Sequence, residues 1–363
     1  MNEPAFRKLL RDIKSSDIAK VEDSANAVCA LKDKDSLNLI LKTLEEDDNP
    51  LVKRVMLWAL RNYSTGLDYF KFLRYLADED MGVREAALVL FMDGGKSAID
   101  VLVNAVDSDD LNIRYSSVQA LGQFRSPEAL PALISAASSD NDEIREIAVM
   151  SVGVYADALV TPVLINALSD SGDIALAALS GLKGRILKTE ELKAVEKLLS
   201  NDRDDIRAAC VYVLDAACPD KAGKDESSYV RRAFASVTAS KNILAKLCSD
   251  ADSSVRTSAA DSIGRQKFSL DDVLIPMLKD EIPGVRRAAA SALGNSSGEN
   301  TINALIECLS DVKPGIRAAA AASLGKIGGE RAVSALKAAM KTKNPILAGI
   351  IKNALAQAEG KKE

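Results

Sequence analysis

A short pattern recurs at nearly constant spacing along the 363-residue chain. A branched aliphatic residue followed by a basic residue, here called the marker pair, opens an Ala-rich run that ends in Leu-Gly. Clear marker pairs are Val83-Arg84, Ile113-Arg114, Ile144-Arg145, Ile206-Arg207, Val255-Arg256, Val285-Arg286 and Ile316-Arg317. Degenerate copies in the same frame are Val21-Glu22, Val52-Lys53, Ile174-Ala175 and Ile346-Leu347.

The copies lie 30 to 32 residues apart, except for one step of 49 residues between Arg207 and Arg256. Repeats of this length are typical of helix pairs that stack into a solenoid, because one pair cannot bury its apolar face alone. The sequence therefore predicts an all-α protein, an α-solenoid (superhelix) of about eleven two-helix repeats. We expect a single solenoid over residues 1–363, with an irregular repeat or insertion at about 208–250 that could be a hinge, a kink or a tolerated loop.

One face of each helix that carries a marker pair is expected to pack. Between Asp280 and Leu293, apolar and small residues fall on the same side as Arg286 at helical spacing. The opposite side should line a continuous exposed surface. The predicted packed side holds Val285, Arg286, Ala289, Ala290 and Leu293, and the predicted exposed side holds Arg287, Ala288, Ser291 and Asn295.

An arginine on the packed side needs a carboxylate, because an unpaired charge is costly to bury. Asp recurs six residues before several marker arginines, close to the turn that precedes the helix. We therefore predict a structural ladder of Asp and Arg that ties adjacent repeats together. Its predicted members are Asp78, Arg84, Asp250, Arg256, Asp280, Arg286, Asp311 and Arg317, and Asp47 stands in the same relation to Lys53.

The glycine that closes the pattern is expected to end the marker helix, because glycine commonly follows the last helical residue. The glycines concerned are Gly122, Gly264, Gly294 and Gly325.

The pattern Asp-x5-Val-Arg-x2-Ala-Ala-x2-Leu-Gly resembles the short HEAT-like repeats of phycobilin lyases and of many bacterial and archaeal scaffold proteins. The resemblance spans roughly Asp17 to Ala356. It implies a HEAT-repeat fold in which the marker helices line the concave face, so that their exposed side forms a binding groove. The resemblance specifies the fold and leaves the function open.

Composition argues against most catalytic chemistry. The chain has no histidine, which excludes Ser-His-Asp and Cys-His centres and His-ligated metals. It also excludes the His-Glu metal sites of iron hydroxylases that are built on similar repeats. The five cysteines are scattered and form no CxxC pair, so we expect buried free thiols and neither a metal site nor a cofactor.

Charge is unevenly distributed along the chain. Residues 252–363 hold 16 Lys and Arg against 12 Asp and Glu, which gives a net charge of +4. Because the net charge of the whole chain is −5, residues 1–251 have a net charge of −9. A nucleic-acid partner is unexpected without a strongly basic stripe, which also disfavours the HEAT-like DNA glycosylases. The sequence shows no signal peptide and no membrane-spanning run, so a cytoplasmic location is expected.

Aromatic residues concentrate between Trp58 and Phe124, which hold nine of the fifteen in the chain. We expect Phe70, Phe91 and Phe124 to be core residues. Trp58 and Tyr115 instead fall on the predicted exposed side, where aromatic residues favour binding. The predicted partner-binding residues at equivalent positions are Arg54, Trp58, Asn62, Glu85, Val89, Tyr115, Gln119, Gln123, Glu146, Met150 and Tyr212.

Two functions follow from these observations. The first is a non-enzymatic scaffold that binds a protein or an extended peptide along the groove, with the acidic N-terminal part as the binding region and the C-terminal repeats extending or dimerising the solenoid. The alternative, implied by the resemblance to phycobilin lyases, is a protein that attaches a tetrapyrrole to a pigment protein or chaperones it.

Overall fold

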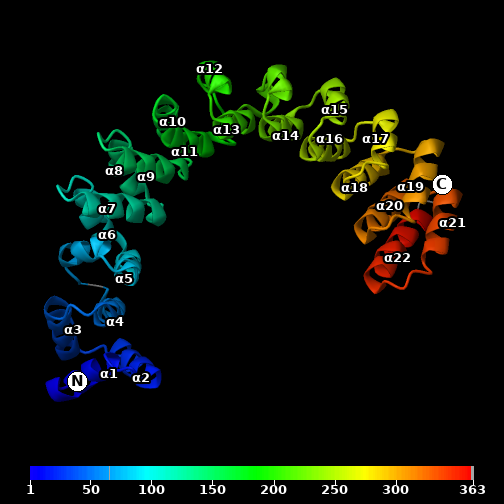
Figure 1. Ribbon diagram of the computed structural model, residues 1–363. Helices are drawn as coiled ribbons and strands as arrows, with labels where there is room; N and C mark the ends of the chain where they lie inside the picture. The colour runs from blue at the N-terminus through cyan, green and yellow to red at the C-terminus, as the bar shows by residue number, and fades with distance from the viewer. Residues whose placement is uncertain (65, 361–363) are drawn as a thin grey trace. The chain divides into compact units, whose positions relative to one another are not determined.

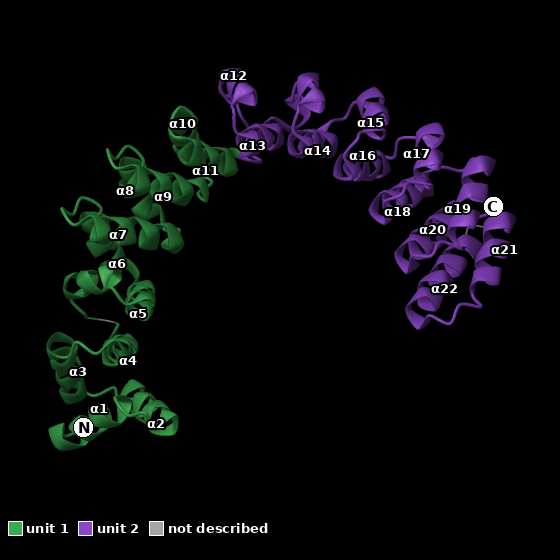
Figure 2. Cartoon of the chain, viewed as in Figure 1, with its two compact units in different colours: residues 1–182 green, residues 183–363 purple. Residues whose placement is uncertain are grey.

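Helices joined by short turns make up the part of the chain that the structure describes. The computed structural model covers residues 1–64 and 66–360, and no strand occurs in those residues (Figure 1). The chain divides into two compact units, unit 1 at residues 1–182 and unit 2 at residues 183–363 (Figure 2). The predicted all-α class is confirmed.

Each marker pair lies on a helix, which we call a marker helix. In unit 1 these are α2 (Ile18–Cys29), α4 (Pro50–Leu60), α5 (Met81–Asp93), α7 (Leu111–Phe124), α9 (Asp142–Gly153) and α11 (Gly172–Leu182). In unit 2 they are α13 (Asp204–Leu214), α14 (Ser228–Val237), α16 (Ser253–Arg265), α18 (Pro283–Ala292), α20 (Pro314–Ile327) and α22 (Pro345–Glu359).

A second helix precedes every marker helix. In unit 1 the second helices are α1 (Glu3–Ile13), α3 (Lys34–Glu46), η2 (Tyr69–Ala77), α6 (Gly95–Ala105), η3 (Pro127–Ala129) with α8 (Leu130–Ala136), and α10 (Val160–Ala167). In unit 2 they are α12 (Thr189–Lys197) with η4 (Leu198–Ser200), η6 (Asp220–Lys224), α15 (Lys241–Leu247), α17 (Asp271–Met277), α19 (Glu299–Cys308) and α21 (Glu330–Ala339). Short 3₁₀ turns η1 (Arg61–Tyr63), η5 (Asp215–Ala217) and η7 (Leu293–Asn295) follow three marker helices.

Within each unit, the marker helices pack side by side as one layer and the second helices pack against that layer. In unit 1, α7 contacts α9, and α9 contacts α11, while α6 and α8 pack on α7 and α9 (Figure 1). Val285, Ala289 and Ala290 on α18 and Leu293 at the start of η7 are fully buried, as the helical spacing predicts. Ala288 is also buried, contrary to the prediction. Its short side chain lies where α18 packs against its neighbouring helices.

The turns before the marker helices carry polar residues that start those helices. Asn49, Asp110 and Asp252 each accept hydrogen bonds from backbone N–H groups in the first turn. Such capping satisfies donors that have no partner inside the helix. The same turns therefore fix where each marker helix begins.

The prediction that the motif glycines end the marker helices is wrong for Gly122, Gly264 and Gly325, which lie inside α7, α16 and α20, whereas Gly294 follows α18 in η7. Gly264 lies inside α16, and a Cβ atom at this position would stand 3.0 Å from the Cα of Ala292 on the neighbouring marker helix. A Cβ on Gly153 would stand 3.1 Å from the Cα of Gly181. These glycines are required for the close approach of adjacent marker helices rather than for a left-handed turn.

The step of 49 residues between Arg207 and Arg256 contains an additional marker pair, which divides the step into two short repeats. Val230-Arg231 forms the marker pair of α14, and Val230 is fully buried. The preceding second helix is reduced to the 3₁₀ segment η6, and the next one, α15, spans only Lys241 to Leu247. Two short repeats thus occupy the length that the sequence analysis left open as a hinge, a kink or a loop.

Candidate binding surface of the marker helices

Five arginines of the marker pairs share one hydrogen-bonding pattern, namely Arg145, Arg207, Arg231, Arg256 and Arg286. In Arg256, Nη1 donates to the backbone oxygen of Asp250 at 2.8 Å, while Nε and Nη2 donate to the carboxylate of Asp280 at 2.8 and 3.0 Å. The carbonyl belongs to the turn before the same helix, and the carboxylate to the turn of the next repeat. Bidentate pairs of this kind fix geometry as well as charge.

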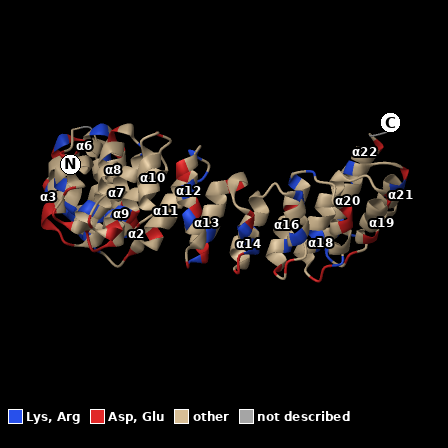
Figure 3. Cartoon of the chain, turned by 90° about the horizontal axis from the view of Figure 1, so that it is seen from above, with Lys and Arg blue, Asp and Glu red and all other residues tan. Residues whose placement is uncertain are grey.

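The pattern recurs in both units, and we call each such pair a rung of the ladder. Each Asp on a rung precedes one marker helix but binds the basic residue of the preceding repeat. Acidic and basic residues both occur along each unit (Figure 3). The rungs are Lys53–Asp78, Arg145–Asp170, Arg207–Asp225, Arg231–Asp250, Arg256–Asp280 and Arg286–Asp311.

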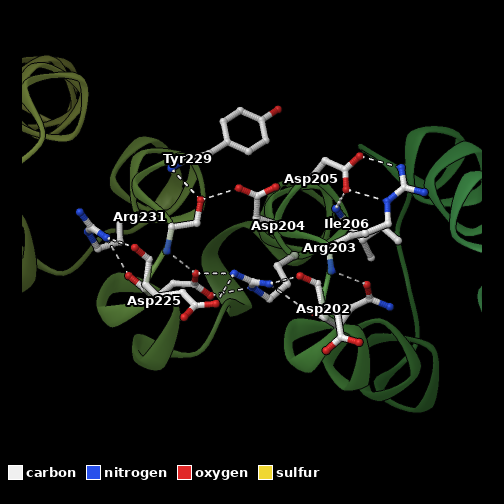
Figure 4. A network of polar contacts seen from close by, with 12 residues as sticks. Asp202, Arg203, Asp204, Asp205, Ile206, Asp225, Tyr229 and Arg231 are labelled. Carbon is white, nitrogen blue, oxygen red and sulfur yellow. Dashed lines mark hydrogen bonds and ion pairs between the residues drawn. The ribbon is translucent and has the colours of Figure 1, made fainter.

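The most buried rung joins Arg207 to Asp225. Figure 4 shows Asp225 and the polar residues around it. Burial raises the pKa of Asp225, but the hydrogen bonds from Arg207 and from the backbone of Ser227 outweigh it and hold that pKa below its ordinary value. Ser227 also donates to the carboxylate of Asp204 at 2.7 Å. These contacts tie α13 to α14, so the acidic cluster here serves packing.

Two predicted ladder arginines make only the first half of the pattern. Nη1 of Arg84 donates to the backbone oxygen of Asp78 at 2.7 Å, and Nη1 of Arg317 donates to that of Asp311 at 2.7 Å. Neither guanidinium has a carboxylate partner among the described residues.

The predicted partner-binding residues of unit 1 lie on α4, η1, α5, α7 and α9. Trp58 and Met150 are each 52% exposed and Tyr115 is 36% exposed. Exposure of large apolar side chains on a protein rich in small ones is typical of binding surfaces. Arg54, Asn62, Glu85, Gln119 and Gln123 are exposed, whereas Val89 and Glu146 are partly buried.

Two pockets lie between adjacent marker helices and contain several of these residues. Pocket A, of about 580 Å³, lies between α5 and α7 and is lined by Glu85, Tyr115 and Gln119. Pocket B, of about 460 Å³, lies between α9 and α11 and includes Glu146 and Met150. The structure therefore brings five predicted residues into two separate hollows of the marker layer.

Other predicted residues have different surroundings. The Asn62 side chain donates to the backbone oxygens of Cys29 and Leu31 at 2.6 and 3.2 Å, so it closes the end of α2. The Arg54 side chain lies over Gly82, where a Cβ atom would come within 2.7 Å of its Nε. Tyr212 belongs to unit 2, where Lys183 Nζ stands 4.8 Å from its ring centroid. It joins neither pocket of unit 1 described above.

Phe70 corrects one expectation about the aromatic residues. Phe91 is fully buried and Phe124 is partly buried, but Phe70 is 72% exposed. It borders a third hollow, of about 600 Å³, together with Leu73 and Val101 of the second-helix layer. The 3₁₀ geometry of η2 places residues three apart on one side, which the prediction of an ordinary helix could not anticipate.

Two members of pocket A were not predicted from the sequence. Met81 is 64% exposed and lines this pocket, as does Arg84. For Arg84 a signal was available, because residue 108, six before Arg114, is Ser where six other repeats have Asp. No comparable signal distinguishes Met81.

Chemical groups that could hold a metal or act as a nucleophile are scarce in the described residues. No cluster of His, Cys, Asp and Glu there has the arrangement of a metal site. All five cysteines are free, and burial raises the pKa of Cys210, Cys218 and Cys248 to about 12. Thiols with such a pKa are poor nucleophiles at neutral pH. Among the described helices, none combines the length and apolar character needed to span a membrane.

The fold and its ladder define an α-solenoid of stacked helix pairs. A family model of HEAT repeats matches residues 71–153 and 271–358. These two regions of the chain are therefore HEAT repeats. The match is to HEAT repeats in general and does not distinguish the phycobilin lyase type. No curated protein matches the sequence.

Solved structures of similar fold are importin solenoids. A chain in the structure of Kap95p with RanGDP is 11% identical and has a TM-score of 0.61, with 98% of this chain and 59% of that one covered. The Kap95–Nup1 complex gives 12% identity, a TM-score of 0.61 and coverage of 98% and 61%. Importin beta is 13% identical and has a TM-score of 0.53, with 95% of this chain and 53% of that one covered. The chain thus spans roughly 53–61% of these proteins, and the likeness concerns the fold alone.

Proposed function

We propose that this chain is a non-enzymatic scaffold that binds a protein or an extended peptide along the marker helices of unit 1. The observation that carries the proposal is the pair of pockets between adjacent marker helices, bordered by exposed Tyr115 and Met150. A row of hollows between parallel helices suits a segment that places successive side chains into them. Trp58 extends the same layer on α4.

Three further observations support binding rather than catalysis. The chain contains no histidine, and the buried cysteines have raised pKa values. Solenoids of similar fold occur in complexes with other proteins, such as Kap95p with RanGDP. The chemistry available on the marker helices is thus recognition by shape, aromatic contact and hydrogen bonding.

The test is affinity capture from lysate of the native host, comparing the wild type with a Trp58→Ala/Tyr115→Ala variant. Removing both aromatic side chains should weaken capture at least about tenfold, because exposed aromatic anchors dominate binding energy. Phe70→Ala is the control, since it removes an even more exposed aromatic from the second-helix layer. Bound proteins are identified by mass spectrometry and bound pigment by absorbance.

Recovery of one protein by the wild type and Phe70→Ala, but not by the double variant, would support the proposal. Equal recovery by all three proteins would exclude this surface. A coloured eluate would instead support the tetrapyrrole function.

A further inference from the structure

The edge of the Arg84 guanidinium formed by Nε and Nη2 is open. In the complete arginine rungs, the same edge binds a carboxylate. In Arg256 and Arg286, Nη1 binds the carbonyl six residues earlier, and Nε and Nη2 bind the next repeat's carboxylate. In Arg84, Nη1 donates to the backbone oxygens of Asp78 and Glu79 at 2.7 and 2.9 Å. The hydrogen bonds of Nη1 are thus the same, while Nε and Nη2 have no partner among the described residues.

The missing carboxylate has an identifiable place in the chain. Ser108 stands six residues before Arg114, where the repeats of α4, α5, α14, α16, α18 and α20 place Asp and those of α9 and α11 also place Ser. Its Oγ accepts from the N–H of Asp110 at 3.2 Å, just as the carboxylate of Asp250 accepts from the N–H two residues on at 2.9 Å. The turn therefore has the usual form, and only the carboxylate is absent.

Arg84 also lines pocket A, together with Met81, Leu88, Asn112 and Tyr115. A planar guanidinium edge binds a carboxylate through two parallel hydrogen bonds. Around it the pocket offers amide and hydroxyl donors and apolar surface from Met81 and Leu88. This combination fits an acidic side chain with apolar neighbours.

Two glutamates limit the charge that the site accepts. Glu79 and Glu85 border the same pocket, and both are exposed. Exposed charges are screened by water and salt, so they do not prevent binding of one carboxylate. They oppose a segment with dense negative charge. Asp78, the remaining acid, is already paired with Lys53 at 3.2 Å.

We propose that Arg84 binds the carboxylate of a single Asp or Glu side chain, flanked by apolar residues, in an extended segment of the partner protein. The ligand thereby completes the rung that Ser108 leaves open. This inference rests on the proposed function and specifies the chemistry of its partner.

The first test does not need the partner. The Nε–H signal of Arg84, assigned by its loss in Arg84→Gln, is followed by NMR during titration with N-acetylglutamate α-amide. The neutral N-acetylglutamine α-amide is the control ligand. A saturable shift is expected with the glutamate compound only. Equal shifts with both compounds, or no shift, would overturn the proposal.

The second test fills the open rung from within the chain. Ser108→Asp should occupy the Arg84 edge, raise the urea midpoint of unfolding and weaken both the NMR titration and partner capture about tenfold to a hundredfold, the range for a hydrogen bond to a charged group. Ser108→Asn, which has the same shape without the charge, should leave both unchanged. Unchanged binding in a Ser108→Asp protein of raised stability would overturn the inference.

The two proposals can fail separately. Capture that requires Trp58 and Tyr115 but is unaffected by Ser108→Asp would refute the acidic ligand and leave the scaffold function standing. A saturable shift at Arg84 without any captured protein would support the carboxylate site and refute the scaffold function.

Discussion

At the scale of single residues, the rungs show how a charged pair can stabilise a helical stack. The Arg231 guanidinium hydrogen-bonds Asp250 at 2.7 and 2.8 Å and holds the pKa of that carboxyl below its ordinary value. Both side chains are largely shielded from water. A pair of this kind is costly to break because the remaining charge stays buried.

We therefore expect Asp250→Asn to lower the free energy of unfolding by about 2 kcal/mol at pH 7. A carboxyl with a lowered folded-state pKa contributes stability above its unfolded-state pKa and loses it as pH falls through the folded value. The wild type should thus lose more stability than Asp250→Asn when the pH drops below about 4. Urea midpoints at pH 7 and pH 3 measure this. Asp109→Asn, in an exposed turn, is the control, and an equal effect from it would contradict the role of the rung.

At the scale of elements, the turn before each marker helix combines two tasks. It caps the helix and presents the Asp that binds the previous repeat. The shortened repeat at α14 keeps both tasks, because Ser227 caps the helix and Asp225 binds Arg207. The second helices can shrink to a 3₁₀ segment while the marker layer and its ladder continue.

This continuity predicts that Arg231 matters as much as Arg256. Arg231→Met and Arg256→Met each keep an apolar stem and remove one rung, so each should lower the free energy of unfolding by about 2 kcal/mol. Urea unfolding of the two variants, side by side, provides the measurement. A silent Arg231→Met beside a destabilised Arg256→Met would mean that α14 is an insertion outside the ladder.

At the scale of the whole molecule, the boundary between the two units falls in a segment that the periodicity did not indicate. Residues 183–188 lie between α11 and α12 and outside both helices. Ile186 is fully exposed and Gly184 has a φ of +79°. The chain divides into its two compact units at this segment rather than in the shortened repeat.

Limited trypsin digestion of the full chain should therefore cut first after Lys183 or Lys188, both exposed. Proteases need extended, accessible backbone, which helices within the units do not offer. Mass spectrometry should detect two fragments of about half the chain each before smaller products. Initial cleavage in residues 215–228 would instead identify the shortened repeat as the weak point.

The sequence by itself determined the solenoid class, because a helix pair of about 30 residues can bury its apolar and small residues only by stacking on its neighbours. It also determined that Asp precedes the marker basic residue by six positions in six of the repeats, and that Ser108 is one of the positions without a carboxylate. Tertiary structure decided what no single repeat contains. Only the stack of repeats shows that Gly264 allows the close approach of Ala292 on the next marker helix. It also shows that Asp280 binds Arg256 of the preceding repeat, and that Tyr115 and Arg84 border one pocket. These are contacts between repeats, and local spacing constrains one helix at a time.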